Sequence, residues 1–287
     1  MLYTIENEQL RVKIAGRGGE LWSIYGKKTD YEYLWQGDPT VWCDRSPLVF
    51  PTCGLLKDGC YTYAGKRYEM GEHGFIAAED LTVAAHTEDS ITLTLTDTPE
   101  TRVIYPFSFR YSVTYSLSGD TLHIAFCVEN RDEKTLIFAL GGHPGFLLPP
   151  EEAESYRFRF APGTAPRQIL FESNLCRHEQ ADFPLENDSF AFSHKTFDEG
   201  SWFFTDIGST VTLSSPRHPR GVRVDFAGFP VLGFWREEGS GASYVCIEPW
   251  ESIPSYFDTP EALETKAMMN HLPKGGVHKA EYSVTLL

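Results

Sequence analysis

The sequence predicts an all-β protein, a large antiparallel β-sandwich, on three observations. Short runs of alternating apolar and polar residues recur along the chain, which is typical of strands with one buried face. Glycine, aspartate and serine residues separate these runs, as they do in the turns between antiparallel strands. Only one segment has a helical pattern. The chain of 287 residues contains no linker-like stretch, so we expect a single domain over residues 1–287.

Eight runs with period-two alternation are predicted to be strands: residues 10–14, 90–96, 109–115, 121–128, 156–160, 210–213, 222–226 and 282–286. The turn residues at 64–66 and 118–120 predict two hairpins. Residues 260–270 are the helical exception, because Pro260 stands near the first turn and the apolar residues lie mainly on one side. We therefore expect one helix near the C-terminal end and strands elsewhere.

The composition limits the classes of partner. The chain has 25 basic and 40 acidic residues and a formal net charge of −15, so we expect neither nucleic acid nor an anionic membrane as a partner. The first residues lack the basic and apolar regions of a signal peptide, and no apolar stretch is long enough to span a bilayer. These features favour a cytoplasmic protein, and the sequence is compatible with both a monomer and a homodimer.

The cysteines and histidines give no sign of a metal centre. None of the six cysteines forms a Cys-x-x-Cys pair, so buried free thiols are expected. The nine histidines show neither the His-x-His nor the His-x-x-x-His spacing, and zinc sites usually use such closely spaced ligands. We predict that the protein needs no metal and no cofactor.

The segment Gly141-Gly142-His143-Pro144-Gly145-Phe146 carries the first candidate catalytic residue. It follows an apolar run over residues 136–140. Glycine tolerates backbone angles that other residues avoid, and proline fixes its own, so His143 should have few conformations and be held ready for catalysis. The alternative is a tight structural loop in which His143 bonds to the backbone.

Two further segments supply titratable residues. Glu248 stands at the end of the apolar run 244–250, before a proline and a tryptophan. Burial there would raise its pKa and suit it to general acid or base catalysis, although a strand-end ion pair with an arginine would explain it equally well. His73 is followed by a glycine and an aromatic residue, and such a histidine is more often structural when it stands alone.

Aromatic residues make up 14% of the chain, and some of them are candidates to stack on the C–H face of a sugar. Trp235 and Trp250 are the best of these, because each lies near the Glu248 segment in the sequence. The alternative for most aromatic residues is an ordinary place in a strand or in the core.

These segments, in this order and spacing, resemble the aldose 1-epimerase, or galactose mutarotase-like, family, most closely its branch with a Gly-Gly-His-Pro motif. The matching segments are residues 45–51, 65–66, 73–75, 141–146 and 247–250. The resemblance implies a β-supersandwich and an isomerase that interconverts the α and β anomers of a free aldose. It also implies that Glu248 is the general base, His143 the general acid, and His73 a ligand of the sugar near its ring oxygen.

The same comparison extends the candidate site and exposes departures from the family. Phe75 lies within a matching segment and is expected to contact the sugar. Leu55 and Ala77 stand where relatives commonly have arginine, and Arg45 is a candidate substitute, although a surface ion pair would also explain it. Asp188 and Asp206 are candidates for an aspartate that some relatives use, with no preference between them.

The missing arginines keep other functions open. A protein that binds sugar without turning it over is the main alternative. A glycoside hydrolase would usually need two carboxylates that flank the bond, and only Glu248 stands out. A metal-dependent β-barrel isomerase would also place histidines and a glutamate on strands, but the absence of closely spaced histidines argues against it.

Overall fold

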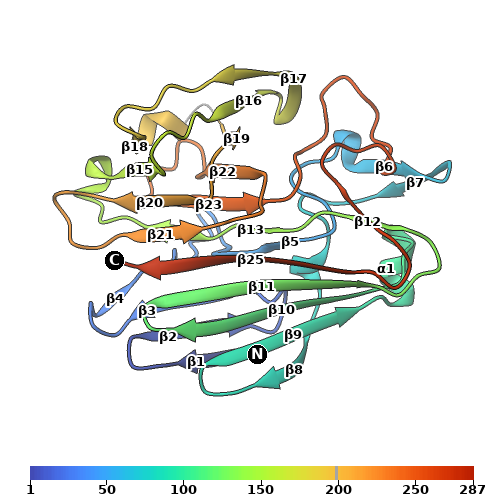
Figure 1. Cartoon of the computed structure of the whole chain (residues 1–287), viewed down its shortest axis with the longest axis horizontal. Coiled ribbons are helices and arrows are strands. Elements are labelled where there is room, and N and C mark those ends of the chain that lie inside the picture. The colour runs from blue at the N-terminus through green and yellow to red at the C-terminus, as the bar shows by residue number, and fades with distance from the viewer. Residues whose placement is uncertain (198–199) are drawn as a thin grey trace.

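The computed structural model describes residues 1–197 and 200–287, and in these ranges the chain consists mainly of antiparallel strands (Figure 1). The all-β class is therefore confirmed. The largest sheet runs in the spatial order β18 (Ser189–Ala191), β15 (Arg157–Phe160), β20 (Thr210–Ser214), β21 (Val222–Asp225), β25 (Val277–Leu286), β11 (Thr121–Asn130), β10 (Phe109–Ser118), β9 (Ser90–Thr96) and β8 (Thr82–His86). All eight runs that were predicted to be strands form strands of this sheet or of the N-terminal sheet.

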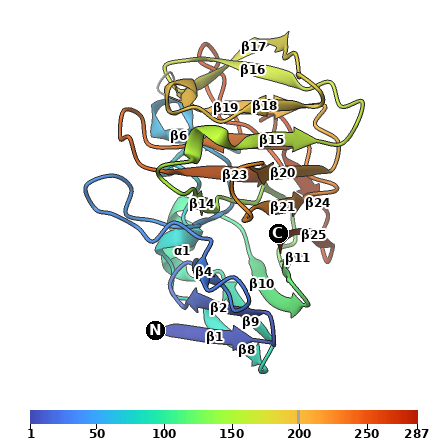
Figure 2. The same ribbon diagram turned by 90° about the vertical axis from the view of Figure 1, so that its left-hand side faces the viewer.

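A second large sheet carries Glu248 and the two short strands that flank His143. Its spatial order is β17 (Leu175–Asp182), β16 (Arg167–Glu172), β19 (Trp202–Thr205), β22 (Val231–Trp235), β23 (Tyr244–Trp250), β13 (Gly141–Gly142) and β5 (Leu48–Val49), and β14 (Gly145–Leu147) also pairs with β23. Figure 2 shows this sheet from the side, with β16 and β17 at the end of the molecule that is remote from the N-terminus.

The remaining elements are smaller. The N-terminal sheet contains β1 (Leu2–Glu6), β2 (Leu10–Ala15), β3 (Leu21–Gly26) and β4 (Tyr31–Glu32). Two-stranded pairs join β6 (Cys60–Tyr63) to β7 (Lys66–Glu69), and β12 (Leu136–Phe138) to β24 (Asn270–Leu272). The described helical segments are α1 (Pro99–Ile104), η1 (Lys57–Gly59), η2 (Ile76–Ala78), η3 (Ala153–Ser155) and η4 (His194–Phe197). No helix in the described ranges is long and apolar enough to cross a membrane.

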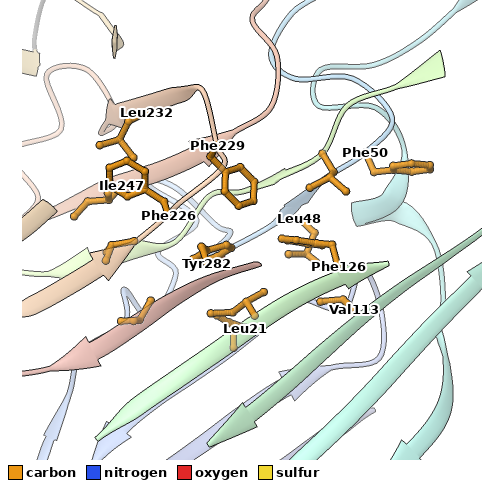
Figure 3. Packing of buried hydrophobic residues seen from close by; sticks show 14 of the residues in the cluster. Leu21, Leu48, Phe50, Val113, Phe126, Phe226, Phe229, Leu232, Ile247 and Tyr282 are labelled. Carbon is orange, nitrogen blue, oxygen red and sulfur yellow. The ribbon is translucent and has the colours of Figure 1, made fainter. Parts of the chain in front are cut away.

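The core lies between the sheets, as Figure 3 shows for Phe126, Tyr282 and Ile247. Strand β11 alternates strictly between buried and partly exposed positions, so one face of it packs inward. Burial of one such aromatic or aliphatic side chain stabilises the fold by about 1.5–3 kcal/mol. Strand β23 differs because all of its residues are buried. Its Val245 and Ile247 belong to the main core, so alternation turns Cys246, Glu248 and Trp250 to the opposite face.

Both predicted hairpin turns are confirmed, and their backbone angles explain the residues found there. Strands β10 and β11 pair Ser118 with Thr121 across a two-residue loop, in which Gly119 has a φ of 59°. The loop between β6 and β7 has positive φ at both Ala64 and Gly65. Two-residue hairpin loops require such angles because they match the twist of the strands.

The predicted helix over residues 260–270 is wrong. Tertiary hydrogen bonds occupy the backbone there: Leu263 N donates to Thr62 O, and Ser252 Oγ donates to Ala267 O at 2.8 Å. The buried Lys266 ammonium donates to Ile253 O at 2.8 Å and pairs with Glu261 at 3.1 Å. A segment this short forms only a marginal helix without packing support, so these partners determine its conformation.

One helix escaped the sequence analysis, and the cysteines depart partly from expectation. Helix α1 begins with a capping box at Thr98 and a proline in its first turn, which are helix-start signals. All six cysteines are free, but Cys43 is exposed, and Cys60 and Cys127 are partly exposed. The expectation of buried thiols is therefore wrong for Cys43.

Candidate active site

A cavity of about 450 Å³ lies over the face of β23 that is turned away from the core. It joins side chains from β22 and β23 with others from the loops around them. The lining contains aromatic residues, carboxylates and two of the candidate histidines: Trp42, Asp44, Leu55, Glu72, His73, His143, Phe203, Trp235, Arg236, Glu237, Glu238, Glu248 and Trp250. Five of the seven predicted site residues therefore meet in one place.

Glu248 is a buried carboxyl group with no hydrogen-bond partner in the described residues. Strand β23 holds it opposite Gly233 of β22, and the residue is fully buried. Neither of its carboxyl oxygens has a hydrogen-bond partner among residues 1–197 and 200–287. Burial, followed by the charge of Glu72, raises the pKa of Glu248 well above its ordinary value. A buried group without a partner costs stability, which makes a structural role a poor explanation.

His143 lies beside Glu248 in the short connection between β13 and β14. Its Nε2 is 3.4 Å from Oε1 of Glu248, an ion-pair distance, although the two atoms do not meet hydrogen-bond geometry. Nδ1 of His143 has no hydrogen-bond partner in the described part of the chain. Burial and then the neighbouring His73 lower the pKa of His143 well below its usual value. The imidazole and the carboxyl group are thus adjacent, and both retain unused hydrogen-bonding atoms.

The glycines around His143 serve close packing rather than unusual backbone angles. Gly142 and Gly145 do not have positive φ, so the conformational freedom that the sequence suggested is not what these positions use. A side chain at position 142 would collide with the Tyr282 hydroxyl, and one at position 145 would come within 2.8 Å of the Trp42 ring. Glycine lets the backbone approach both aromatic rings and so sets the position of His143.

His73 has a defined tautomer in this site. The backbone N–H of Gly54 donates to Nδ1 of His73 at 3.2 Å, so the neutral ring carries its proton on Nε2. Burial lowers the pKa of His73 to about 4, which keeps the ring neutral near pH 7. Its ring centroid is 5.3 Å from that of His143. His73 can therefore offer an N–H donor to an oxygen of a bound molecule.

Three tryptophans surround the His143 ring. The ring centroids of Trp42, Trp235 and Trp250 are 5.3, 5.4 and 6.3 Å from that of His143. The sequence analysis identified Trp235 and Trp250 but missed Trp42, which lies in the loop between β4 and β5 and stacks on Tyr244. No period or motif marks this loop tryptophan, because only the tertiary fold brings it to the cavity.

Two predicted site residues lie outside the cavity lining. The Arg45 guanidinium stacks 3.8 Å over the Trp22 ring and donates to Trp22 O at 2.9 Å. Phe75 is buried in the aromatic core against Phe50. Stacking on Trp22 accounts for Arg45, and packing in the core accounts for Phe75. Neither residue lines the cavity.

The two positions that depart from the family lie in different places, one in the cavity lining and one outside it. Leu55 lines the cavity, whereas Ala77, an exposed residue of η2, does not. Asp188 is outside the lining, where its carboxylate accepts from Gly163 N at 3.1 Å, and the exposed Asp206 is outside it as well. The carboxylates that do line the cavity beside Glu248 are Asp44, Glu72, Glu237 and Glu238. The sequence analysis named none of these four.

A cluster of three buried side chains could also hold a metal ion. The ligand atoms of His143, Cys246 and Glu248 all lie within 4.8 Å of one another. Their donor types suit zinc. Burial, and then the charge of Glu248, raise the pKa of Cys246 well above its ordinary value, which disfavours the thiolate that a metal would bind. Metal independence stays a prediction.

Comparison with known proteins identifies the family and the fold of this chain. The sequence model of the family described as aldose 1-epimerase matches residues 1–284, so the chain belongs to that family. Expectation and finding agree on the family, and on the fold that it implies.

Several individual proteins are similar to this chain over its whole length. A galactose mutarotase related enzyme from Lactobacillus acidophilus superposes with a TM-score of 0.97 at 35% identity, over 100% of this chain and 97% of that one. A galactose mutarotase-like protein from Lactobacillus casei gives a TM-score of 0.95 at 30% identity, over the full length of both chains. Chromosomal Protein LacX of Lactococcus lactis is 29% identical over the whole of both sequences.

Proposed function

We propose that this protein is an aldose 1-epimerase, a mutarotase that interconverts the α and β anomers of a free aldose by general acid and base catalysis. The observation that carries the proposal is the buried Glu248 carboxyl group, which has no hydrogen-bond partner in the described residues and lies 3.4 Å from His143. The cavity above the pair has a volume of about 450 Å³, within the range of small-molecule sites, about 300–1,000 Å³.

The reaction needs two proton transfers at neighbouring oxygens. In the proposed mechanism Glu248 removes the proton from the O1 hydroxyl while His143 protonates the ring oxygen O5, and the C1–O5 bond breaks to give the open aldehyde. After rotation about the C1–C2 bond, the two groups act in reverse and close the ring as the other anomer. Each positioned acid or base typically contributes about 10²–10⁴-fold.

The opposed pKa shifts support shared use of one proton. Burial raises the pKa of Glu248 and lowers that of His143, so near neutral pH the pair holds one proton, which rests mainly on Glu248 and can pass to His143. We propose that the carboxylate and imidazolium form starts ring opening, and that the Nε2–H of His73 donates to a sugar oxygen near O5. These steps require no metal and no cofactor.

The test is the rate of anomer equilibration, measured by polarimetry or exchange NMR, for glucose, galactose and xylose. Wild-type protein should accelerate equilibration of at least one sugar, and His143→Asn should reduce kcat/KM by about 10²–10⁴-fold. His278→Asn is a control, because His278 pairs with Glu251 outside the cavity lining. Wild-type protein that accelerates none of these sugars would contradict the proposal.

One observation favours a second function, sugar binding without turnover. Leu55 lines the cavity at a position where the family resemblance leads us to expect arginine. Saturable quenching of tryptophan fluorescence by a sugar, with equilibration at the uncatalysed rate, would identify a binding protein.

A further inference from the structure

The cavity lining carries a strong excess of negative charge. Asp44, Glu72, Glu237 and Glu238 come from three different loops and join Glu248 in the lining. Among the ion pairs in residues 1–197 and 200–287, none joins one of these four loop carboxylates to a lysine or an arginine; Glu72 contacts only His73, at 3.7 Å. A ligand in this cavity therefore meets several carboxylates that lack a lysine or arginine partner in the described residues.

The cations near the cavity do not balance these carboxylates. Arg45, which the sequence suggested as a ligand, is turned onto Trp22. Arg236 lines the cavity and contacts His194 and Ser240, and its one positive charge stands against four loop carboxylates. His73 and His143 both have lowered pKa values because of burial, and they add little positive charge near pH 7.

Two further features of the cavity suit a cation. Trp42, Trp235 and Trp250 line the cavity around the His143 ring, and aromatic faces attract ammonium groups. The two oxygens of the fully buried Glu248 have no hydrogen-bond partner in the described part of the chain, and Glu248 lines the cavity. The acidic residues are thus part of a built pocket rather than an isolated surface cluster.

We propose that the candidate site selects aldoses by charge: it accepts aminoaldoses at least as well as neutral aldoses and rejects aldoses that carry a phosphate or a carboxylate. This inference rests on the proposed function and specifies its substrate class. The physical reason is attraction of the sugar ammonium by the loop carboxylates and aromatic faces, and repulsion of any anionic substituent.

The test compares glucosamine, glucose and glucose 6-phosphate at slightly acidic pH, where the amine is protonated. We measure kcat/KM by exchange NMR, and Kd by quenching of tryptophan fluorescence. Glucosamine should exceed glucose 6-phosphate by about tenfold or more in both quantities, because each partly exposed carboxylate contributes about two- to fivefold. Added salt should reduce this ratio, since exposed charges are screened.

The variant for this test is the double substitution Glu237→Gln and Glu238→Gln, which keeps side-chain size and removes two charges. It should lower the ratio of glucosamine to glucose 6-phosphate by about fourfold or more. Glu88→Gln, at an exposed turn between β8 and β9, is the matched control and should leave the ratio unchanged.

The outcomes separate the two proposals. Rapid equilibration with no dependence on charge, or with preference for the phosphate, overturns the charge inference and leaves the mutarotase proposal standing. Binding with the expected order but no acceleration overturns the mutarotase proposal and supports the charge inference. Failure of all three sugars to bind overturns both.

Discussion

Glu248 and Glu251 stand three residues apart, and both are buried glutamates beside a histidine, yet their surroundings are opposite. Glu251 has both oxygens bonded, Oε1 to His278 Nε2 at 2.6 Å and Oε2 to Asn270 at 2.6 Å. Both oxygens of Glu248 lack a hydrogen-bond partner in the described residues, and Glu248 lines the cavity. The contrast teaches that burial of a charged residue does not by itself indicate an active site; a buried carboxyl group that lacks a partner and also lines a cavity is the stronger candidate.

The largest expected effect separates these two glutamates by activity. Glu248→Gln should reduce kcat/KM for anomer equilibration by about 10²–10⁴-fold, because an amide cannot take the O1 proton. Glu251→Gln should change the rate less than about threefold, but should lower the free energy of unfolding by about 1–3 kcal/mol, because its charged hydrogen bonds are weakened. Polarimetry and urea unfolding of both variants measure the difference. Equal loss of activity in the two variants would erase the contrast.

The raised pKa of Glu248 also predicts how the stability of Glu248→Gln relative to wild type depends on pH. The folded pKa of Glu248 is raised, so its favourable contribution is complete below the unfolded pKa and is lost as pH rises through the folded value. Glu248→Gln avoids this loss. Its stability relative to wild type should therefore increase from acidic to neutral pH in urea unfolding. A constant difference across that range would argue against a raised pKa.

A smaller effect concerns the alkaline limb of the pH–rate profile. The pair is active while it holds one proton, so the rate should fall as pH rises through the raised pKa of Glu248, where that proton is lost. The charge of Glu72 contributes to the raised pKa, and Glu72→Gln should move the alkaline limb to lower pH. Glu238→Gln is the control, since Glu238 lines the cavity without contributing to this shift. Profiles of kcat/KM measure both, and a limb that moves upward in Glu72→Gln would be inconsistent with the assigned base.

The smallest expected effect concerns the aromatic wall. Trp42→Leu should raise KM, or the Kd of a non-reacting sugar, by about two- to tenfold, because one aromatic contact is worth roughly 0.5–1.5 kcal/mol. Trp22→Leu removes a tryptophan that packs against Arg45 outside the cavity. It should leave KM unchanged in the same titration. If Trp42→Leu binds sugar as wild type does, Trp42 only supports His143.

The strand pattern was readable from the sequence because it depends on neighbours in the chain. Alternation every two residues marked β10 and β11, and the turn at Gly119 marked their hairpin. The helix prediction over residues 260–270 failed because that segment depends on contacts with distant parts of the chain. Lys266 and Leu263 bond to residues distant in sequence, and no local pattern reports such partners.

The sequence by itself determined the fold class, the family, and the three segments that present His73, His143 and Glu248, since each has a recognisable local environment. Only the tertiary structure decided which residues share a cavity. It brought Trp42 and the loop carboxylates to the site and kept Arg45 and Phe75 away from it. The physical reason is that these contacts join loops and strands far apart in the chain, where packing and charge act between surfaces rather than between sequence neighbours.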